Sequence, residues 1–340
     1  MKFIRLLLFP FAILYDLITS IRNFLFDKQI FKSTSFNVPI IVVGNLSVGG
    51  TGKTPQIEYL INLLQNTYKV AVLSRGYKRK TKGFLLVDQS HSVAEVGDEP
   101  LQFFKKFKNI QVAVDADRAH GIQQLLNQKN SPEVILLDDA FQHRKVKANF
   151  YILLTKYDDL YCDDLVLPSG NLRESKRGAK RANIIIVTKC PENLTEKQQE
   201  KIKNKLRVKS NQQVFFTTIL YDTKLKGAQE LVLDQLKSYQ VVLVTGIANP
   251  KPLEQYLQSL QISYQPMRFS DHHYFSDKDI EAIKERYLKI EASRKIILTT
   301  EKDYVRLEKK LKNLSYIPIK TFFVDDKNMF DTAIKSFLKN

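Results

Sequence analysis

Short apolar runs alternate with polar or amphipathic stretches over most of the chain. Runs of β-branched and aliphatic residues bounded by turn residues are typical of buried strands, and the segments between them are long enough for helices. The first runs that we expect to be strands are 40–43, 70–73, 84–87, 112–114, 134–137, 151–154, 184–187 and 214–217. This alternation predicts an α/β fold with a doubly wound, mainly parallel sheet.

A second, smaller set of apolar runs follows. Its members are 241–245, 296–299 and 322–324. We therefore expect a second, smaller α/β domain after the first. The predicted organisation is an N-terminal amphipathic helix in 1–32, a larger domain in 33–225 and the smaller C-terminal α/β domain in 226–340.

Near the N-terminus, apolar residues recur at helical spacing while polar residues fall on another face. The stripe consists of Ile4, Leu7, Leu8, Phe11, Leu14, Ile18, Ile21 and Leu25. The apolar run between Arg5 and Asp16 is shorter than the roughly 20 residues that span a bilayer core, and no signal-peptide cleavage site follows it. Basic residues nearby are Lys2, Arg5, Arg22, Lys28 and Lys32. We expect this helix to lie on an anionic membrane surface, to pack on the protein's own core, or to do both.

The chain has a net charge of +17, from 53 Lys and Arg against 36 Asp and Glu. This excess favours an anionic partner such as a membrane lipid, a nucleic acid or a phosphorylated substrate, although a solvated basic surface is the plain alternative. The two cysteines, Cys162 and Cys190, have neither metal-binding nor disulfide spacing, which indicates a reducing compartment.

The most specific motif follows the first predicted strand. Residues 40–55 read Ile-Ile-Val-Val-Gly-Asn-Leu-Ser-Val-Gly-Gly-Thr-Gly-Lys-Thr-Pro, and an apolar helical face follows from Ile57. A glycine-rich turn between a strand and a helix predicts a loop that binds the phosphates of ATP. Its expected residues are Ser47, Val48, Gly49, Gly50, Thr51, Gly52, Lys53 and Thr54. Lys53 would reach the β- and γ-phosphates and Thr54 would bind Mg²⁺, although Ser47 replaces the usual first glycine.

A pair of acids ends the apolar run at 134–137. Asp138 and Asp139 have the form of a Walker B segment, which directs a carboxylate at Mg²⁺ or its waters. Gln142 and His143 follow at the sheet edge where α/β folds bind ligands, so both are candidates for contacts with a ligand. The alternative is that His143 is a surface residue or a helix cap whose hydrogen bonds are satisfied without a ligand.

Three further segments offer groups for phosphoryl transfer. Asp98 and Glu99 could accept a proton and bind Mg²⁺, or they could only cap a helix. Residues 270–274 contain two histidines suited to orient a carboxylate across a domain cleft, without the further ligands of a zinc site. Arg173 suits contacts with a transferring phosphoryl group.

Seven segments together carry a resemblance to a known family. They are 43–55, 74–77, 96–100, 138–144, 167–174, 271–274 and 299–303. In this order they resemble the tetraacyldisaccharide 4'-kinases, the lipid A 4'-kinases of Gram-negative bacteria. The resemblance runs to about Asp303 and includes Ser47, while Ala140 and Phe141 replace a frequent Gly-Tyr, for which we expect only a local packing consequence.

The resemblance implies that 33–225 is a P-loop NTPase-like kinase domain and that the N-terminal helix associates with the membrane. It also implies transfer of the ATP γ-phosphate to the 4'-hydroxyl of a tetraacyl glucosamine disaccharide 1-phosphate. The product would be lipid IVA, made at the cytoplasmic face of the inner membrane by a peripheral or monotopic protein. Asp98 would be the catalytic base, paired with His272, and Glu99 and Gln142 would assist the metal. Residues implied near the reacting phosphate or the substrate are Arg118, Arg173 and Glu174, with Tyr77 and Asn171 as further candidates.

The alternative is a membrane-associated P-loop switch ATPase of the partitioning or positioning class. The loop of those proteins begins with a lysine where this chain has Val48, which argues against that class. A nucleic-acid-binding NTPase would explain the charge, but the basic residues lack the aromatic interleaving of a recognised module. We therefore expect no nucleic-acid partner, and protein partners stay open.

Overall fold

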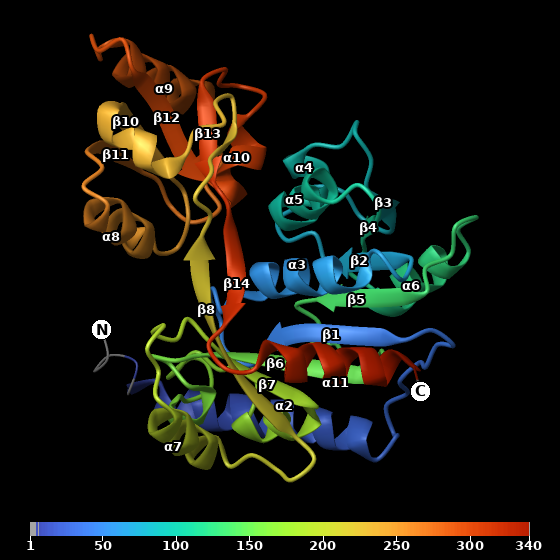
Figure 1. Cartoon of the computed structure of the whole chain (residues 1–340). Coiled ribbons are helices and arrows are strands. Elements are labelled where there is room, and N and C mark those ends of the chain that lie inside the picture. Colours follow the sequence, from blue (N-terminus) through green and yellow to red (C-terminus); the bar gives the residue numbers. More distant parts are fainter. Residues whose placement is uncertain (1–4, 6, 340) are drawn as a thin grey trace.

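The computed structural model describes residues 5 and 7–339, and it contains two β-sheets flanked by helices (Figure 1). Lys2 and Ile4 of the predicted N-terminal helix lie outside the described residues. Strands β8 and β14 extend from the larger sheet toward the smaller one and link the two bodies (Figure 1). The predicted α/β class with a mainly parallel sheet is confirmed.

The larger sheet has nine strands in the order β14-β8-β7-β6-β1-β5-β2-β4-β3. In chain order they are β1 (Ile40–Asn45), β2 (Val70–Ser74), β3 (Leu85–Leu86), β4 (Gln111–Val114), β5 (Val134–Asp138), β6 (Phe150–Lys156), β7 (Ile184–Thr188), β8 (Gln213–Tyr221) and β14 (Ile319–Phe323). β1 lies between β5 and β6 and is parallel to both. The phosphate-loop strand and the strand of the acid pair are therefore neighbours, and their carboxyl ends share one edge of the sheet.

Helices cover both faces of this sheet. They are α3 (Lys53–Leu64), α5 (Asp98–Lys106) and α11 (Lys327–Lys339) on one face, and α6 (Arg118–Leu126) and α7 (Glu196–Leu206) on the other. Shorter elements are α4 (Val93–Val96) and the 3₁₀ helices η1 (Tyr161–Asp163) and η2 (Lys176–Arg181). The predicted apolar face of α3 is confirmed, because Ile57, Leu60, Ile61 and Leu64 are all buried against the sheet.

The smaller sheet has five strands in the order β11-β10-β12-β13-β9. They are β9 (Lys226–Gly227), β10 (Gln240–Thr245), β11 (Tyr264–Arg268), β12 (Lys295–Thr300) and β13 (Leu314–Ile317). One face packs on η3 (Leu233–Ser238) and α8 (Lys251–Ser259), and the other on α9 (Asp277–Leu288) and α10 (Glu301–Leu307). The sequence analysis missed β11 and β13, because Tyr-Gln-Pro-Met-Arg and Leu-Ser-Tyr-Ile contain no continuous apolar run.

The C-terminal segment returns to the larger sheet, which corrects one expectation. The sequence analysis assigned 322–324 to the smaller domain, but β14 pairs antiparallel with β8, with Ile319 opposite Tyr221. α11 then buries Phe330 and Ile334 in the core of the larger sheet. This long-range pairing has no local sequence signal. The other predicted domain boundaries stay a prediction.

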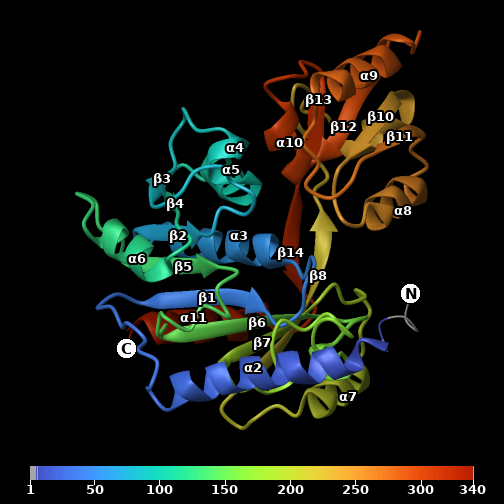
Figure 2. The ribbon, with the colours of Figure 1, turned by 180° about the vertical axis from the view of Figure 1, so that it is seen from behind.

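The N-terminal helix α2 (Phe9–Asp27) lies along the body of the larger sheet, near α7 (Figure 2). Only Ala12 and Thr19 of this helix are buried. Its large exposed apolar residues are Phe9, Phe11, Ile13, Leu14, Leu17, Ile18, Ile21 and Phe24. By length and composition alone its 19 residues could cross a membrane. Its polar side chains, however, bind the protein: Tyr15 donates to the carbonyl of Arg173 at 2.9 Å and Arg22 to that of Gln142 at 2.6 Å.

Candidate functional site

The glycine-rich loop joins β1 to α3, as the sequence predicts. Gly49 and Gly52 have φ of +102° and +87°, in the region that favours glycine. Lys53 is the first residue of α3, and its Nζ lies 3.4 Å from Oδ1 of Asn45 and 3.6 Å from Oδ1 of Asp139. The ammonium group is thus held at the mouth of the loop by two oxygen atoms.

Contacts from outside brace this loop. Ser47 is buried and forms an isolated antiparallel β-bridge with Leu172, and the amide of Val48 donates to the carbonyl of Asn171 at 2.8 Å. At the end of β7, Lys189 donates to the carbonyl of Gly50 at 2.8 Å and the Thr188 hydroxyl donates to that of Thr51 at 2.9 Å. The sequence analysis did not single out Thr188 and Lys189. These bonds brace the loop from the end of β7 and from residues 171–172.

Carboxylates gather beside the loop. Asp138 ends β5, and its Oδ2 accepts a hydrogen bond from Ser74 Oγ at 3.0 Å, while its buried Oδ1 has no partner among the described residues. Burial, together with the negative charges of Glu99 and Asp139, raises the pKa of Asp138 well above its usual range. Thr54 Oγ1 lies 3.3 Å from Oε1 of Glu99. A concentrated negative charge with an unpartnered oxygen fits a hard cation such as Mg²⁺.

The described residues contain no group of three or more His, Cys, Asp or Glu arranged to hold a metal ion by themselves. Mg²⁺ usually takes one or two carboxylates and completes its shell with phosphate oxygens and waters. Thr54, Glu99 and Asp138 are the residues that fit such an ion.

Asp139 instead pairs with two cations. Arg173 Nη1 lies 2.9 Å and 3.0 Å from the two carboxylate oxygens of Asp139, and Lys53 Nζ lies 3.6 Å from Oδ1 of the same carboxylate. Burial alone would raise the pKa of Asp139, but the charges of Lys53 and Arg173 outweigh it and lower that pKa. In this arrangement Asp139 anchors the two basic groups, and its metal-binding role stays a prediction.

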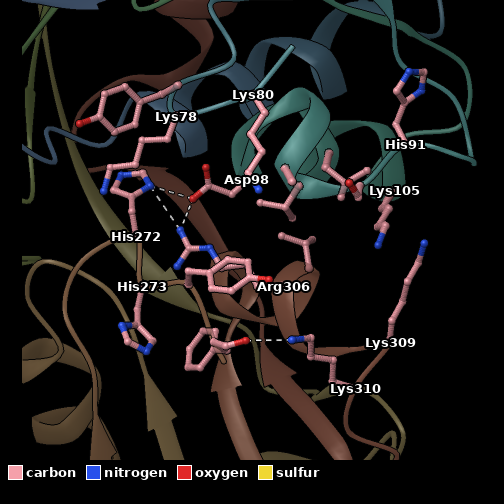
Figure 3. A pocket seen from close by; sticks show the side chains of 18 residues that line it. Lys78, Lys80, His91, Asp98, Lys105, His272, His273, Arg306, Lys309 and Lys310 are labelled. Atoms are coloured by element: carbon pink, nitrogen blue, oxygen red, sulfur yellow. Dashed lines mark hydrogen bonds and ion pairs between the residues drawn. The ribbon is translucent and has the colours of Figure 1, made fainter. Parts of the chain in front are cut away.

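Asp98 and His272 meet although they come from different bodies of the molecule, Asp98 from α5 beside the larger sheet and His272 from the loop between β11 and α9. Asp98 begins α5 after Gly97, and its Oδ2 lies 2.9 Å from Nδ1 of His272 (Figure 3). Lys302 Nζ lies 3.0 Å from Nε2 of His272. Because an ammonium group only donates, Nε2 accepts from Lys302, which leaves Nδ1 to donate to Asp98. Arg306 Nη2 also lies 3.3 Å from Nδ1, as expected where both nitrogens donate to the same carboxylate oxygen. His272 therefore orients the carboxylate of Asp98.

Two cations from α10 complete this pair, and the sequence analysis missed both. Arg306 contacts the same Oδ2 of Asp98 (Figure 3), while Lys302 lies 3.8 Å from that oxygen and 3.9 Å from Oε1 of Glu99. Burial would raise the pKa of Asp98, but the hydrogen bond of His272 and the charges of Arg306 and Lys302 hold it well below its usual range. Lys302 was visible in the 299–303 segment, and Arg306 follows about one helical turn later on the same face.

The Asp98–His272 pair opens on a cavity of about 450 Å³ between the two bodies. The ring of Tyr77 packs edge-on against that of His272, with centroids 5.1 Å apart. His273 lies in another direction, with its Nε2 3.1 Å from Oδ2 of Asp279 (Figure 3). Of the two neighbouring histidines, His272 is the one that contacts Asp98.

The remaining candidates near the N-terminal helix are held in a polar network. The buried Glu174 accepts hydrogen bonds from Asn23 at 2.6 Å, Gln142 at 3.0 Å and Arg181 at 2.7 Å. Gln142 also donates to the carbonyl of Asn45 at 2.9 Å. Asn171 Oδ1 accepts from Arg5 at 3.0 Å. Glu174, Gln142 and Asn171 thus connect the N-terminal segment with the phosphate loop, and their metal and substrate roles stay predictions.

Arg118 and His143 lie beside the acid pair. Arg118 is buried and donates to the carbonyls of Asp115 at 2.8 Å and Asp138 at 3.3 Å. Burial lowers the pKa of Arg118 to about 10, against the charge of Asp138. Burial and the charge of Arg118 lower the pKa of His143 to about 4. His143 is therefore neutral at pH 7.

A phosphate loop next to a carboxylate cluster and an oriented carboxylate defines a P-loop phosphotransferase. The sequence model of the tetraacyldisaccharide-1-P 4'-kinases matches residues 4–339, and the chain belongs to that family. It is 57% identical to the tetraacyldisaccharide 4'-kinase of Flavobacterium johnsoniae, with 100% of this chain and 98% of that protein covered. The same enzyme of Phocaeicola vulgatus is 44% identical, with 98% and 94% covered.

A solved structure supports the same assignment. The "apo" form of LpxK from Aquifex aeolicus, in complex with ATP, has a TM-score of 0.80 and 33% sequence identity to this chain. The match covers 98% of this chain and 99% of the other. These likenesses favour the kinase over the switch ATPase.

Proposed function

We propose that this protein transfers the γ-phosphate of ATP to the 4'-hydroxyl of a tetraacyl glucosamine disaccharide 1-phosphate, which forms lipid IVA in lipid A biosynthesis. The observation that carries the proposal is the Asp98–His272 contact beside the phosphate loop, in a member of the 4'-kinase family. An oriented carboxylate suits transfer to an alcohol, which must lose a proton.

The loop from Ser47 to Thr54 binds the phosphates of ATP. Lys53 contacts the β- and γ-phosphates, and Thr54, Glu99 and Asp138 hold Mg²⁺, supported by the unpartnered Oδ1 of Asp138. When bound, Mg²⁺ neutralises negative charge on the phosphates. Asp139 and Gln142 are proposed as additional groups near the metal.

Asp98 accepts the proton of the 4'-hydroxyl as the bond between that oxygen and the γ-phosphorus forms. The bond to the β–γ bridging oxygen breaks, and ADP leaves. The lowered pKa of Asp98 keeps this carboxylate ionised at neutral pH. His272 orients it, and Arg173, close to Lys53 through Asp139, stabilises charge on the transferring group.

The acceptor approaches from the side of the N-terminal helix. The proposed contacts with its head group come from Tyr77, Arg118, His143, Asn171 and Glu174. Supporting observations are the exposed ring of Tyr77 beside His272 and the hydrogen bonds that tie Glu174 and Asn171 to the N-terminal segment.

Helix α2 docks on the cytoplasmic face of the inner membrane, as in a peripheral or monotopic protein. Its polar residues Tyr15, Arg22 and Asn23 bind the protein body while its apolar residues face outward. A helix tied along its length in this way presents one side to the lipid instead of leaving the body to span it. The basic chain suits anionic lipids.

The test is transfer of labelled phosphate from Mg-ATP to a detergent-solubilised tetraacyl disaccharide 1-phosphate by the purified protein. We expect label on the lipid, at the 4' position by mass-spectrometric fragmentation. Label found only as free phosphate would refute the kinase proposal.

A further inference from the structure

A buried cluster of three charges connects helices from both bodies of the molecule. Lys106 Nζ on α5 lies 2.7 Å from Oε2 of Glu58 on α3 and 2.9 Å from a carboxylate oxygen of Glu301 on α10. The side chains of Lys106, Glu58 and Glu301 are 18%, 5% and 6% exposed. Gln102 donates to the other oxygen of Glu58 at 2.9 Å. We call Glu58, Lys106 and Glu301 the three-helix charge cluster.

Each helix of the cluster begins in the functional site. α3 begins at Lys53 and α5 at Asp98. α10 begins at Glu301 itself, and the next residue is Lys302. Lys106 lies roughly two turns along α5 from Asp98. The cluster therefore joins the helix of the phosphate loop, the helix of the base and the helix that brings Lys302 and Arg306 to the base.

The ion pairs of the cluster stabilise the protein most when all three helices are in contact. A buried ion is costly unless its partners are in place, and removing one partner leaves an uncompensated charge. Lys106 has a carboxylate partner on α3 and another on α10, so its ammonium is fully paired only with α10 docked. Burial raises the pKa of Glu58 to about 7, and the charge of Lys106 opposes that rise. The cluster therefore favours the arrangement in which α10 contacts α3 and α5.

We propose that Lys106 is a positioning residue for phosphoryl transfer. It holds α10 against α5 and α3, and through α10 it holds Lys302 and Arg306 against Asp98. Lys106 is paired with Glu58 and Glu301 and does not line the cavity beside Asp98, so it acts on the geometry of the base and not on binding. The proposal rests on the kinase function proposed above.

The main test is the Lys106→Met variant, which removes the charge and keeps most of the side chain. Misplacement of a reacting group by about 1 Å can cost on the order of 100-fold in rate, so we expect kcat to fall by at least about tenfold. KM for ATP and for the lipid should change by less than about twofold, because the loop and the lipid site are untouched. Equal kcat in variant and wild type would overturn the proposal.

A control variant removes an ion pair that lies outside both the cluster and the cavity. Lys284 Nζ on α9 lies 2.8 Å from Oε1 of Glu281, and the side chains of Lys284 and Glu281 are 44% and 64% exposed. Lys284→Met should leave kcat within about twofold, because exposed pairs contribute little. A kcat that falls equally in both variants would overturn the special role of the cluster.

A neutral triple variant separates positioning from stability. Glu58→Gln, Lys106→Met and Glu301→Gln together leave no unpaired buried charge, so the melting temperature should recover relative to Lys106→Met. We expect kcat to stay low in this folded variant, whereas a recovery of kcat together with stability would overturn the proposal. A wild type without lipid phosphorylation refutes the kinase function itself, while an active wild type with an equally active Lys106→Met refutes only this inference.

Discussion

Nδ1 of His272 lies 2.9 Å from Oδ2 of Asp98, and this contact joins the smaller sheet to the first residue of α5. A carboxylate in this position is the expected base, so Asp98→Asn should lower kcat by about 10²- to 10⁴-fold. KM for ATP should change little, because the phosphate loop is intact. Steady-state rates of lipid phosphorylation measure both quantities.

The control for Asp98→Asn is Asp271→Asn. Asp271 lies 3.9 Å from Nε2 of His272 but its side chain is 42% exposed, so its charge is screened by solvent. We expect kcat within about threefold of the wild type. A larger loss of kcat in Asp271→Asn than in Asp98→Asn would show that Asp98 is not the base.

Removal of Arg306 should shift the pH dependence of the reaction. Burial opposes ionisation of Asp98, and Arg306 with His272 and Lys302 lowers its pKa below the ordinary 3.8. Without Arg306 the pKa of Asp98 rises. Because Asp98 must be ionised to accept a proton, the enzyme then loses activity at a higher pH as the solution is acidified. We expect the acid limb of kcat/KM to move to higher pH for Arg306→Met, and to move less for Arg306→Lys, because the lysine keeps the charge. Identical acid limbs in Arg306→Met and wild type would contradict this role.

Lys302 provides a separate test of the cations on α10. It donates to Nε2 of His272 and lies near Glu99, so Lys302→Met removes the group that fixes the tautomer of the histidine. We expect kcat to fall by about 10- to 100-fold, within the usual range for a lost positioning contact. Lys312→Met, at an exposed position in the turn after α10 and outside the cavity, is the control and should retain the wild-type rate. A full rate in Lys302→Met would limit Lys302 to a structural contact.

Local chemistry explains which parts of this site could be predicted. The strand, the glycine turn and the helix around Lys53 are consecutive in the chain, so their order alone predicts the loop. The pairing of Asp98 with His272 spans 174 residues, and only the resemblance to a family suggested it. Arg306 was missed because an arginine in a charged helix looks like any solvated residue until the fold brings it to Asp98.

The strands show the same division. Runs such as 134–137 are buried on both faces, so their continuous apolar composition predicts a strand. β14 was assigned to the wrong sheet because its partner β8 lies about a hundred residues earlier, and strand register over that distance is decided by tertiary packing. In the acid pair, the pattern could not distinguish Asp138, whose Oδ1 has no partner among the described residues, from Asp139, which binds Arg173.

The lowered pKa of His143 predicts that the free energy of unfolding depends on pH. Its pKa is lowered to about 4 in the folded protein from 6.5, chiefly by burial. The unfolded chain therefore binds a proton more readily, so the free energy of unfolding decreases as the pH falls from about 6.5 toward 4. His143→Gln should lose this part of the decrease. Melting temperatures of both proteins between pH 8 and about 4 measure it, and parallel curves would show that His143 contributes nothing.

The apolar face of α2 predicts membrane binding that can be removed without unfolding the protein. Leu17, Ile18 and Ile21 are exposed, and α2 holds to the body through other residues, such as Tyr15 and Asn23. The triple change of Leu17, Ile18 and Ile21 to Ser should weaken sedimentation with anionic liposomes by at least about tenfold, because each buried apolar side chain contributes on the order of 1.5 kcal/mol or more.

The control for this triple change removes exposed apolar groups elsewhere. Leu288 on α9 and Met329 on α11 are exposed to a similar or greater degree, and Leu288→Ser with Met329→Ser should leave liposome binding unchanged. Phosphorylation of lipid in detergent micelles should survive in both variants, since the base and the phosphate loop are intact. Equal sedimentation of the α2 variant and the wild type would mean that α2 does not dock on the bilayer through this face, and the membrane contact would have to lie elsewhere on the basic surface.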